Sequence, residues 1–205
     1  MIRERSSKDA DFEIAINFCS FSFFPSHPTR GAYYSAKIRN NLRIISLNSN
    51  YCNDENWWLL INGTDPENEL TWLINQLADA EQAGDKVHII GHIPPGKNDC
   101  LQIWSENYYR IVSRFNQTIR GQFYGHTHSD EFQLFFDHDQ LNLAKSTAEL
   151  TELTPVGVAY LAPSITTFVG ANPGYRIYEV DSSTFEVVNY HNYFLDLPDA
   201  NAKTN

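Results

Sequence analysis

The middle of the chain alternates between short apolar runs and longer segments with helical spacing. Runs rich in β-branched residues predict strands over 42–47 and 87–90, because they are too short for helices. Between them, Asp65-Pro66 predicts the start of a helix, with an N-cap followed by proline at the first helical position. Apolar residues spaced so that they fall on one face of a helix extend this helix towards Gly84. They are Leu70, Leu73, Ile74, Leu77 and Ala80. The order strand, helix, strand predicts a βαβ unit with parallel strands.

A second unit of the same kind follows. Apolar spacing predicts a helix over 105–115, and another apolar run predicts a strand over 119–124. The strands 87–90 and 119–124 each end in a glycine followed by a histidine, at Gly91-His92 and Gly125-His126. Because the carboxyl ends of parallel strands meet at one edge of a sheet, both histidines are predicted to lie on one rim.

The C-terminal third of the chain has a different pattern. Weak periodicity over 139–154 predicts a surface insertion, and 198–205 is predicted to be a frayed C-terminus. The remainder predicts strands separated by turns, over 132–136, 156–161, 176–180 and 185–190. No Gly/Ser-rich linker or internal repeat divides the chain, so the prediction is a single α/β domain.

Charge and hydropathy exclude several classes of protein. The formal net charge of −10 and the absence of a basic stripe argue against a nucleic-acid partner, since that binding needs clustered Lys and Arg. No run of 18 apolar residues is present, so no transmembrane segment is predicted. Acidic residues within the first 24 positions, among them Glu4, Asp9 and Asp11, disfavour a signal peptide.

Cysteines and sequons bear on the cellular compartment. Cys19, Cys52 and Cys100 are an odd number, so at most one intramolecular pair can form; the alternative is three reduced, buried thiols. The sequons at Asn62 and Asn116 would be glycosylated in the secretory pathway. Together these features lean slightly towards a secreted protein.

The candidate chemistry lies in three histidines. His126-Thr127-His128 places two imidazoles close together after a strand, and His92 adds a third on the same predicted rim. Neutral imidazoles bind zinc well, so this set would need only carboxylates or an amide from elsewhere to hold two ions. The preceding glycines are expected to let the backbone turn sharply. The alternative is that each histidine caps a strand or satisfies a polar group.

Five segments of the chain resemble a known family. The motifs Gly91-His92-Ile93-Pro94-Pro95-Gly96 and Gly125-His126-Thr127-His128 are similar to those of the acid sphingomyelinase branch of the calcineurin-like metallophosphoesterases. The resemblance covers 29–197, and 1–28 does not look like the family. The matching segments are 87–96, 104–110, 123–132, 161–167 and 172–176. The implied fold is a β-sandwich flanked by helices, of which the N-terminal half is missing.

The resemblance implies roles for individual residues. It makes His92 and His126 ligands of one zinc ion and His128 a ligand of a second. It places Cys52 and Cys100 where the family has a disulfide, and Asn62 at a family glycosylation site. It also places Tyr175 at the substrate rim, although a turn aromatic packing beside Pro173 is an equal alternative.

The implied reaction is metal-dependent hydrolysis of sphingomyelin, a membrane-surface lipid, to ceramide and phosphocholine, in a secreted or lysosomal protein. The family's upstream Asp-x-His, Gly-Asp-x-x-Asp and Gly-Asn-His-Glu motifs do not occur in this sequence. The chain is therefore expected to be an incomplete fragment, inactive alone and without an assigned catalytic residue. Two alternatives remain: a related phosphodiesterase acting on nucleotides or other phosphodiesters, and a non-catalytic remnant. The loop Lys97-Asn98-Asp99 is also longer than the family pattern implies.

Overall fold

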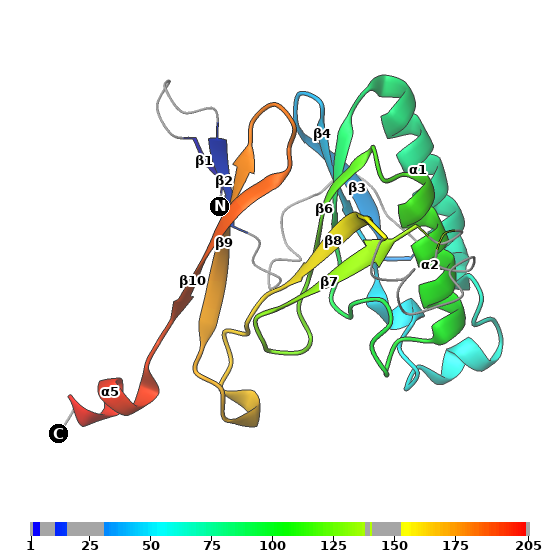
Figure 1. Ribbon diagram of the computed structural model, residues 1–205. Coiled ribbons are helices and arrows are strands. Elements are labelled where there is room, and N and C mark those ends of the chain that lie inside the picture. Colours follow the sequence, from blue (N-terminus) through cyan, green and yellow to red (C-terminus); the bar gives the residue numbers. More distant parts are fainter. Residues whose placement is uncertain (1, 5–10, 16–30, 138–139, 141–152, 204–205) are drawn as a thin grey trace.

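The computed structural model describes residues 2–4, 11–15, 31–137, 140 and 153–203, which form two facing β-sheets with two helices on one outer side (Figure 1). The first sheet has the strand order β3-β4-β5-β6-β8-β7 and the second β1-β2-β9-β10. The strands are β1 (Ile2–Glu4), β2 (Asp11–Ala15), β3 (Tyr34–Arg39), β4 (Leu42–Ser46), β5 (Lys86–Ile90), β6 (Ile119–Tyr124), β7 (Glu131–Phe136), β8 (Pro155–Leu161), β9 (Gly174–Asp181) and β10 (Val187–Phe194). The helices are α1 (Glu69–Ala83), α2 (Gln102–Arg114) and α5 (Leu197–Ala202), with 3-10 turns η1 (Ser49–Tyr51), η2 (Trp57–Leu60), η3 (Pro66–Asn68) and η4 (Phe168–Gly170).

The two predicted βαβ units are confirmed. Strands β4, β5, β6 and β8 pair in parallel, while β3 and β7 are antiparallel edge strands. Helices α1 and α2 connect β4 to β5 and β5 to β6, and both cover the same face of the six-stranded sheet (Figure 1). This topology brings the carboxyl ends of β5 and β6 to one edge, as the sequence predicts.

The core has two layers. Between the helices and the sheet, buried side chains such as Leu73, Leu77, Trp104 and Tyr108 pack on β5 and β6. Between the two sheets lies a smaller cluster consisting of Leu42, Phe123, Tyr178, Val180 and Phe185.

His88 connects β5 to the turn between β9 and β10 of the second sheet. Its ring is buried, and its Nε2 lies 2.7 Å from the carbonyl oxygen of Phe185. Burial lowers the pKa of His88 to about 4, so the ring is neutral over most of the pH range.

The predicted start of the first helix is wrong by about one turn. Glu67 (φ 52°) and Asn68 (φ 58°) have left-handed backbone, so Pro66 begins the short turn η3 and α1 begins only at Glu69. Asp65 nevertheless caps this helix, because its carboxylate accepts hydrogen bonds from the backbone N–H groups of Leu70 (2.8 Å) and Thr71 (3.1 Å).

The predicted C-terminal strands are present, and β9 and β10 are longer than expected. The segment expected to fray instead contains the short helix α5, capped by the Asp196 carboxylate on the Asp199 N–H (3.1 Å). Most of the predicted insertion over 139–154 lies outside the described residues. Within the described part of the chain, no helix is long and apolar enough to cross a membrane.

Candidate metal centre

His92 and His126 meet at the carboxyl edge of the six-stranded sheet. His92 follows β5 and His126 follows β6, and these strands are parallel neighbours. The Nδ1 atom of His126 lies 3.3 Å from the Nε2 atom of His92, with the ring centroids 5.1 Å apart. The structure thus brings together the two histidines that the sequence places on one rim.

His128 lies beside this pair. Its ring contacts Phe168 of η4, with centroids 5.8 Å apart, and its charge is close enough to affect the pKa of His92. The Nδ1 atom of His128 is buried and has no hydrogen-bond partner among the described residues. A buried ring nitrogen without a hydrogen-bond partner calls for an explanation, and a bound ion would supply one.

The backbone turn at the rim is made by the histidines themselves, not by the preceding glycines as expected. His126 (φ 72°) and His128 (φ 60°) have left-handed backbone, which is uncommon for such residues and concentrates at functional sites. Gly91 is required for a different reason, since a Cβ atom there would lie 2.7 Å from the ring of Tyr124.

Two side chains that sequence reasoning missed, Ser49 and Asp99, hold the histidines in place. The buried Ser49 hydroxyl accepts hydrogen bonds from the backbone N–H groups of His92 (2.9 Å) and Ile93 (3.1 Å). The Asp99 carboxylate contacts the Nε2 atom of His126. The only sequence signal for Asp99 was the unusual length of its loop.

The loop after β6 is also anchored to the second sheet. The carboxylate of Asp130 accepts hydrogen bonds from Arg176 on β9 and Asn192 on β10. Arg176 is buried and stacks over the ring of Tyr190, 4.3 Å from its centroid. This ion pair fixes the segment that carries His126 and His128 between the two sheets.

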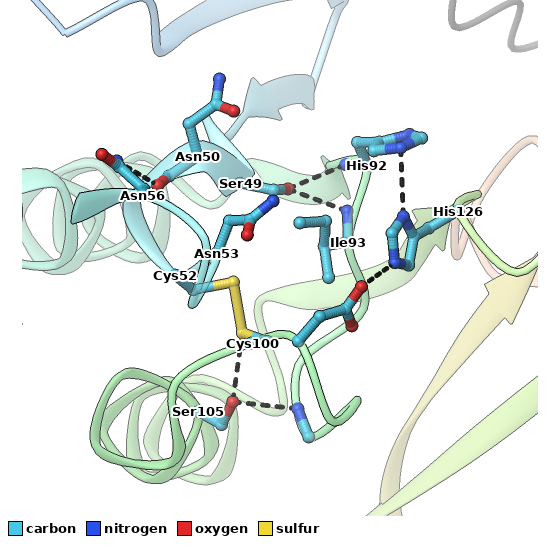
Figure 2. Close-up of a disulfide and its surroundings, with 12 residues drawn as sticks. Ser49, Asn50, Cys52, Asn53, Asn56, His92, Ile93, Cys100, Ser105 and His126 are labelled. Carbon is cyan, nitrogen blue, oxygen red and sulfur yellow. Dashed lines mark hydrogen bonds and ion pairs between the residues drawn. A yellow bond between two sulfur atoms is a disulfide. The ribbon is translucent and has the colours of Figure 1, made fainter. Parts of the chain in front are cut away.

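A disulfide joins Cys52 to Cys100 beneath the rim, as the resemblance implied (Figure 2). Both cysteines are buried, and their Cα atoms are 4.7 Å apart. Cys52 directly follows η1, which contains Ser49, and Cys100 directly follows Asp99. The disulfide therefore connects the segments that hold His92 and His126.

The surroundings of His92 favour its neutral form. Burial is the largest cause of its lowered pKa, and repulsion from His126 and His128 lowers it further, while Asp99 acts in the opposite direction. A neutral imidazole keeps the lone pair that a metal ion needs.

No family model matches the chain, but individual proteins do. Sphingomyelin phosphodiesterases of Bos taurus and Homo sapiens are each 50% identical to it over 175 residues, which is 83% of this chain and 26% of theirs. The chain is homologous to the sphingomyelin phosphodiesterases. It spans about a quarter of the length of these relatives. An acid sphingomyelinase-like phosphodiesterase 3b of Mus musculus is 32% identical over 195 residues, covering 85% of this chain and 39% of that protein.

The comparison with solved structures informs only the fold of this chain. PhoD superposes with a TM-score of 0.50 at 12% identity, covering 85% of this chain and 43% of that one. A dimetal phosphatase of Danio rerio gives a TM-score of 0.48 at 12% identity, covering 79% of this chain and 60% of that one, too low to carry an argument. The α/β class expected from the sequence is confirmed, and the superposition shows a fold shared with part of PhoD.

The spacing of the nitrogen pair fits two ligands of one tetrahedral metal ion such as zinc. Two ligands of a tetrahedral zinc, each about 2.05 Å from the ion, lie about 3.3 Å apart. The nitrogens of His126 and His92 have this spacing. Among the described residues, however, no three His, Cys, Asp or Glu side chains form a complete site. The histidines can therefore supply only part of a ligand set.

Tyr175, the expected rim residue, lies at the start of β9. It is 46% exposed and stacks on Tyr193, with ring centroids 5.1 Å apart at 14°. Both tyrosines line an open hollow of about 370 Å³ together with Ile165, Pro173, Gly174, Phe194 and Leu195. Pro173 lines the same hollow as Tyr175, and Tyr175 has the exposure that a rim residue requires.

Proposed function

We propose that this chain supplies part of the active site of a metal-dependent phosphodiesterase that hydrolyses sphingomyelin. One observation carries the proposal: a chain 50% identical to sphingomyelin phosphodiesterases places two imidazole nitrogens 3.3 Å apart on one sheet edge. Sphingomyelin is favoured over other phosphodiesters because identity to these relatives is higher than the 32% shared with the acid sphingomyelinase-like protein.

In this proposal His92 and His126 hold one zinc ion, through Nε2 and Nδ1, and His128 holds a second. Such ions, when bound, supply a reactive hydroxide at neutral or acidic pH and neutralise charge on the phosphoryl oxygens. The contribution of the chain itself is to keep the imidazoles neutral and oriented. The lowered pKa of His92 and the fixed backbone around His126 support this role.

The proposed substrate contact is the apolar rim beside η4. Tyr175 and Tyr193 form a flat aromatic surface, and Phe168, which contacts His128, is 71% exposed. Exposed aromatic side chains, with Phe168 in contact with His128, suit a lipid that presents its headgroup from a membrane surface.

We propose a secreted or lysosomal location. The disulfide is of the kind that persists in oxidising compartments. Asn62 is exposed and its sequon lies in an open turn, whereas Asn116 is half-buried and Thr118 of its sequon is buried. Glycosylation is therefore proposed at Asn62 in preference to Asn116.

A chimera tests the function. The chain alone lacks the carboxylate and amide motifs of a complete site, so we expect it to have negligible activity. Replacing the matched segment of the bovine relative by the corresponding part of this chain is expected to retain sphingomyelin hydrolysis. His126→Ala in the chimera should lower kcat/KM at least 100-fold, because a metal ligand is removed. Hydrolysis of labelled sphingomyelin in mixed micelles measures the activity of the chimera and of its His126→Ala variant.

The matched control for this experiment is His191→Ala, which removes an exposed histidine of β10 that pairs with Glu179. It should leave kcat/KM within about threefold, since surface changes have small effects. A folded, zinc-loaded chimera without activity, or one in which His126→Ala keeps full activity, would contradict the proposed function.

A further inference from the structure

Asp99 and His92 lie on opposite sides of the His126 ring. The carboxylate of Asp99 contacts Nε2. On the other side of the ring, Nδ1 faces His92 (Figure 2). A neutral imidazole carries one N–H, and a carboxylate can only accept a hydrogen bond. The contact therefore keeps the proton on Nε2 and leaves the lone pair of Nδ1 directed towards Nε2 of His92.

We propose that Asp99 is a positioning residue, which orients the His126 ring and fixes its tautomer so that Nδ1 is the metal-binding atom. This inference rests on the proposed metal-binding function of His126. Histidine ligands of metal ions commonly donate their second ring N–H to a carboxylate, which fixes the ring and raises its basicity. Asp99 occupies that outer position, because it contacts the nitrogen on the far side of the ring from His92.

Three contacts restrain the loop around Asp99 and so fix the position of its carboxylate. The backbone carbonyl of Asp99 accepts a hydrogen bond from the N–H of Asp54 (3.0 Å). One residue later, Cys100 is fixed by its disulfide to Cys52. Two residues earlier, Lys97 forms an ion pair with Glu131 (2.7 Å) at the start of β7. One flank of Asp99 is therefore attached to β7 and the other to the segment after η1.

Hydrogen bonds also connect this loop to α2. The Ser105 hydroxyl accepts a hydrogen bond from the Gly96 N–H (2.9 Å) and lies 3.3 Å from the sulfur of Cys100. The N–H of Leu101 donates to the carbonyl of Cys52 at 2.6 Å. A carboxylate placed by so many backbone contacts loses little conformational entropy when it holds the ring.

Two variants of Asp99 separate positioning from loop structure. Asp99→Leu keeps the side-chain shape but removes the acceptor, whereas Asp99→Asn keeps an oxygen that accepts from Nε2–H. In the 205-residue chain at pH 8, zinc titration calorimetry is expected to show a 10- to 100-fold weaker Kd for Asp99→Leu, the usual effect of losing such a partner. Asp99→Asn should restore most of the affinity. Asp54→Leu removes an exposed carboxylate of the adjacent turn, so it should change the Kd less than about threefold.

A spectroscopic readout requires no metal. In the metal-free chain, the ring N–H proton of His126 should give a downfield NMR resonance that persists in Asp99→Asn and disappears in Asp99→Leu. Unchanged zinc affinity in folded Asp99→Leu, or a resonance that survives in it, would overturn the role of Asp99. Absence of zinc binding by the unchanged chain would instead overturn the proposed function, whatever the resonance shows.

Discussion

Glu69→Gln is expected to stabilise the chain at pH 8 by about 4 kcal/mol, an order-of-magnitude value derived from the pKa difference. Glu69 is fully buried at the first turn of α1, and burial raises the pKa of its carboxyl to about 8. One oxygen accepts a hydrogen bond from the Asn48 N–H (2.6 Å), while Oε2 has no partner among the described residues. Glutamine keeps the acceptor and cannot ionise.

The direction of this effect follows from proton binding. The folded-state pKa lies above the ordinary value of 4.5, so the folded chain binds the Glu69 proton more tightly than the unfolded chain. The resulting stabilisation is fully present below pH 4.5 and is lost as the pH rises through 8. Urea unfolding between pH 6.5 and pH 8, where His88 is neutral in both the folded and the unfolded chain, should show falling stability for the wild type and little change for Glu69→Gln.

The control for this measurement is Glu55→Gln, which neutralises an exposed carboxylate. Its free energy of unfolding should match that of the wild type within about 0.5 kcal/mol at each pH. Equal slopes for the wild type and Glu69→Gln would contradict the account of a buried, protonated Glu69.

His88 limits stability on the acid side. Its folded pKa of about 4 lies below the ordinary 6.5, so its contribution is present above pH 6.5 and lost as the pH falls through 4. Taken with Glu69, this places the stability maximum of the wild type between about pH 4.5 and pH 6.5. Such a maximum suits the lysosome, one of the two locations proposed for the protein.

Removing the disulfide with the double variant Cys52→Ser, Cys100→Ser is expected to lower the free energy of unfolding by about 4 kcal/mol on the chain-entropy model. The two cysteines are 48 residues apart in sequence, so the crosslink restricts a long loop of the unfolded chain. Urea unfolding under non-reducing conditions measures this loss. Zinc affinity should fall as well, because Asp99 and Ser49 lose the covalent link between their segments.

Reduction provides the control for this measurement. Reducing agent should destabilise the wild type and leave the stability of the double variant unchanged. Equal stability of the wild type and the double variant would show that the disulfide contributes nothing to the fold.

Much of this architecture is encoded in local sequence pattern. The apolar runs before Gly91 and Gly125 predict the parallel strands, and parallel pairing alone brings His92 and His126 to one edge. The helical spacing from Leu70 to Ala80 likewise predicts the face of α1 that packs on the sheet. These features depend on the spacing of hydrophobic residues and on the order of the strands, and both can be read from a single sequence.

The remaining features depend on contacts between distant segments. Asp99 and His126 are 27 residues apart, and Arg176 and Asp130 are 46 apart, so no local pattern reveals either pair. The start of α1 also escaped prediction, because left-handed backbone at Glu67 and Asn68 interrupts a run that otherwise suits a helix. The roles of Asp99, of its long loop and of the left-handed backbone at His126 and His128 can be assigned only once the fold is known.

The central claim is that His92 and His126 bind one metal ion through nitrogens that face each other. Zinc-soaked crystals of the 205-residue chain, measured at the zinc absorption edge, test it most directly. The account predicts an anomalous peak about 2.0–2.1 Å from both Nδ1 of His126 and Nε2 of His92. A peak on Nε2 of His126, or zinc bound only at other residues, would contradict it.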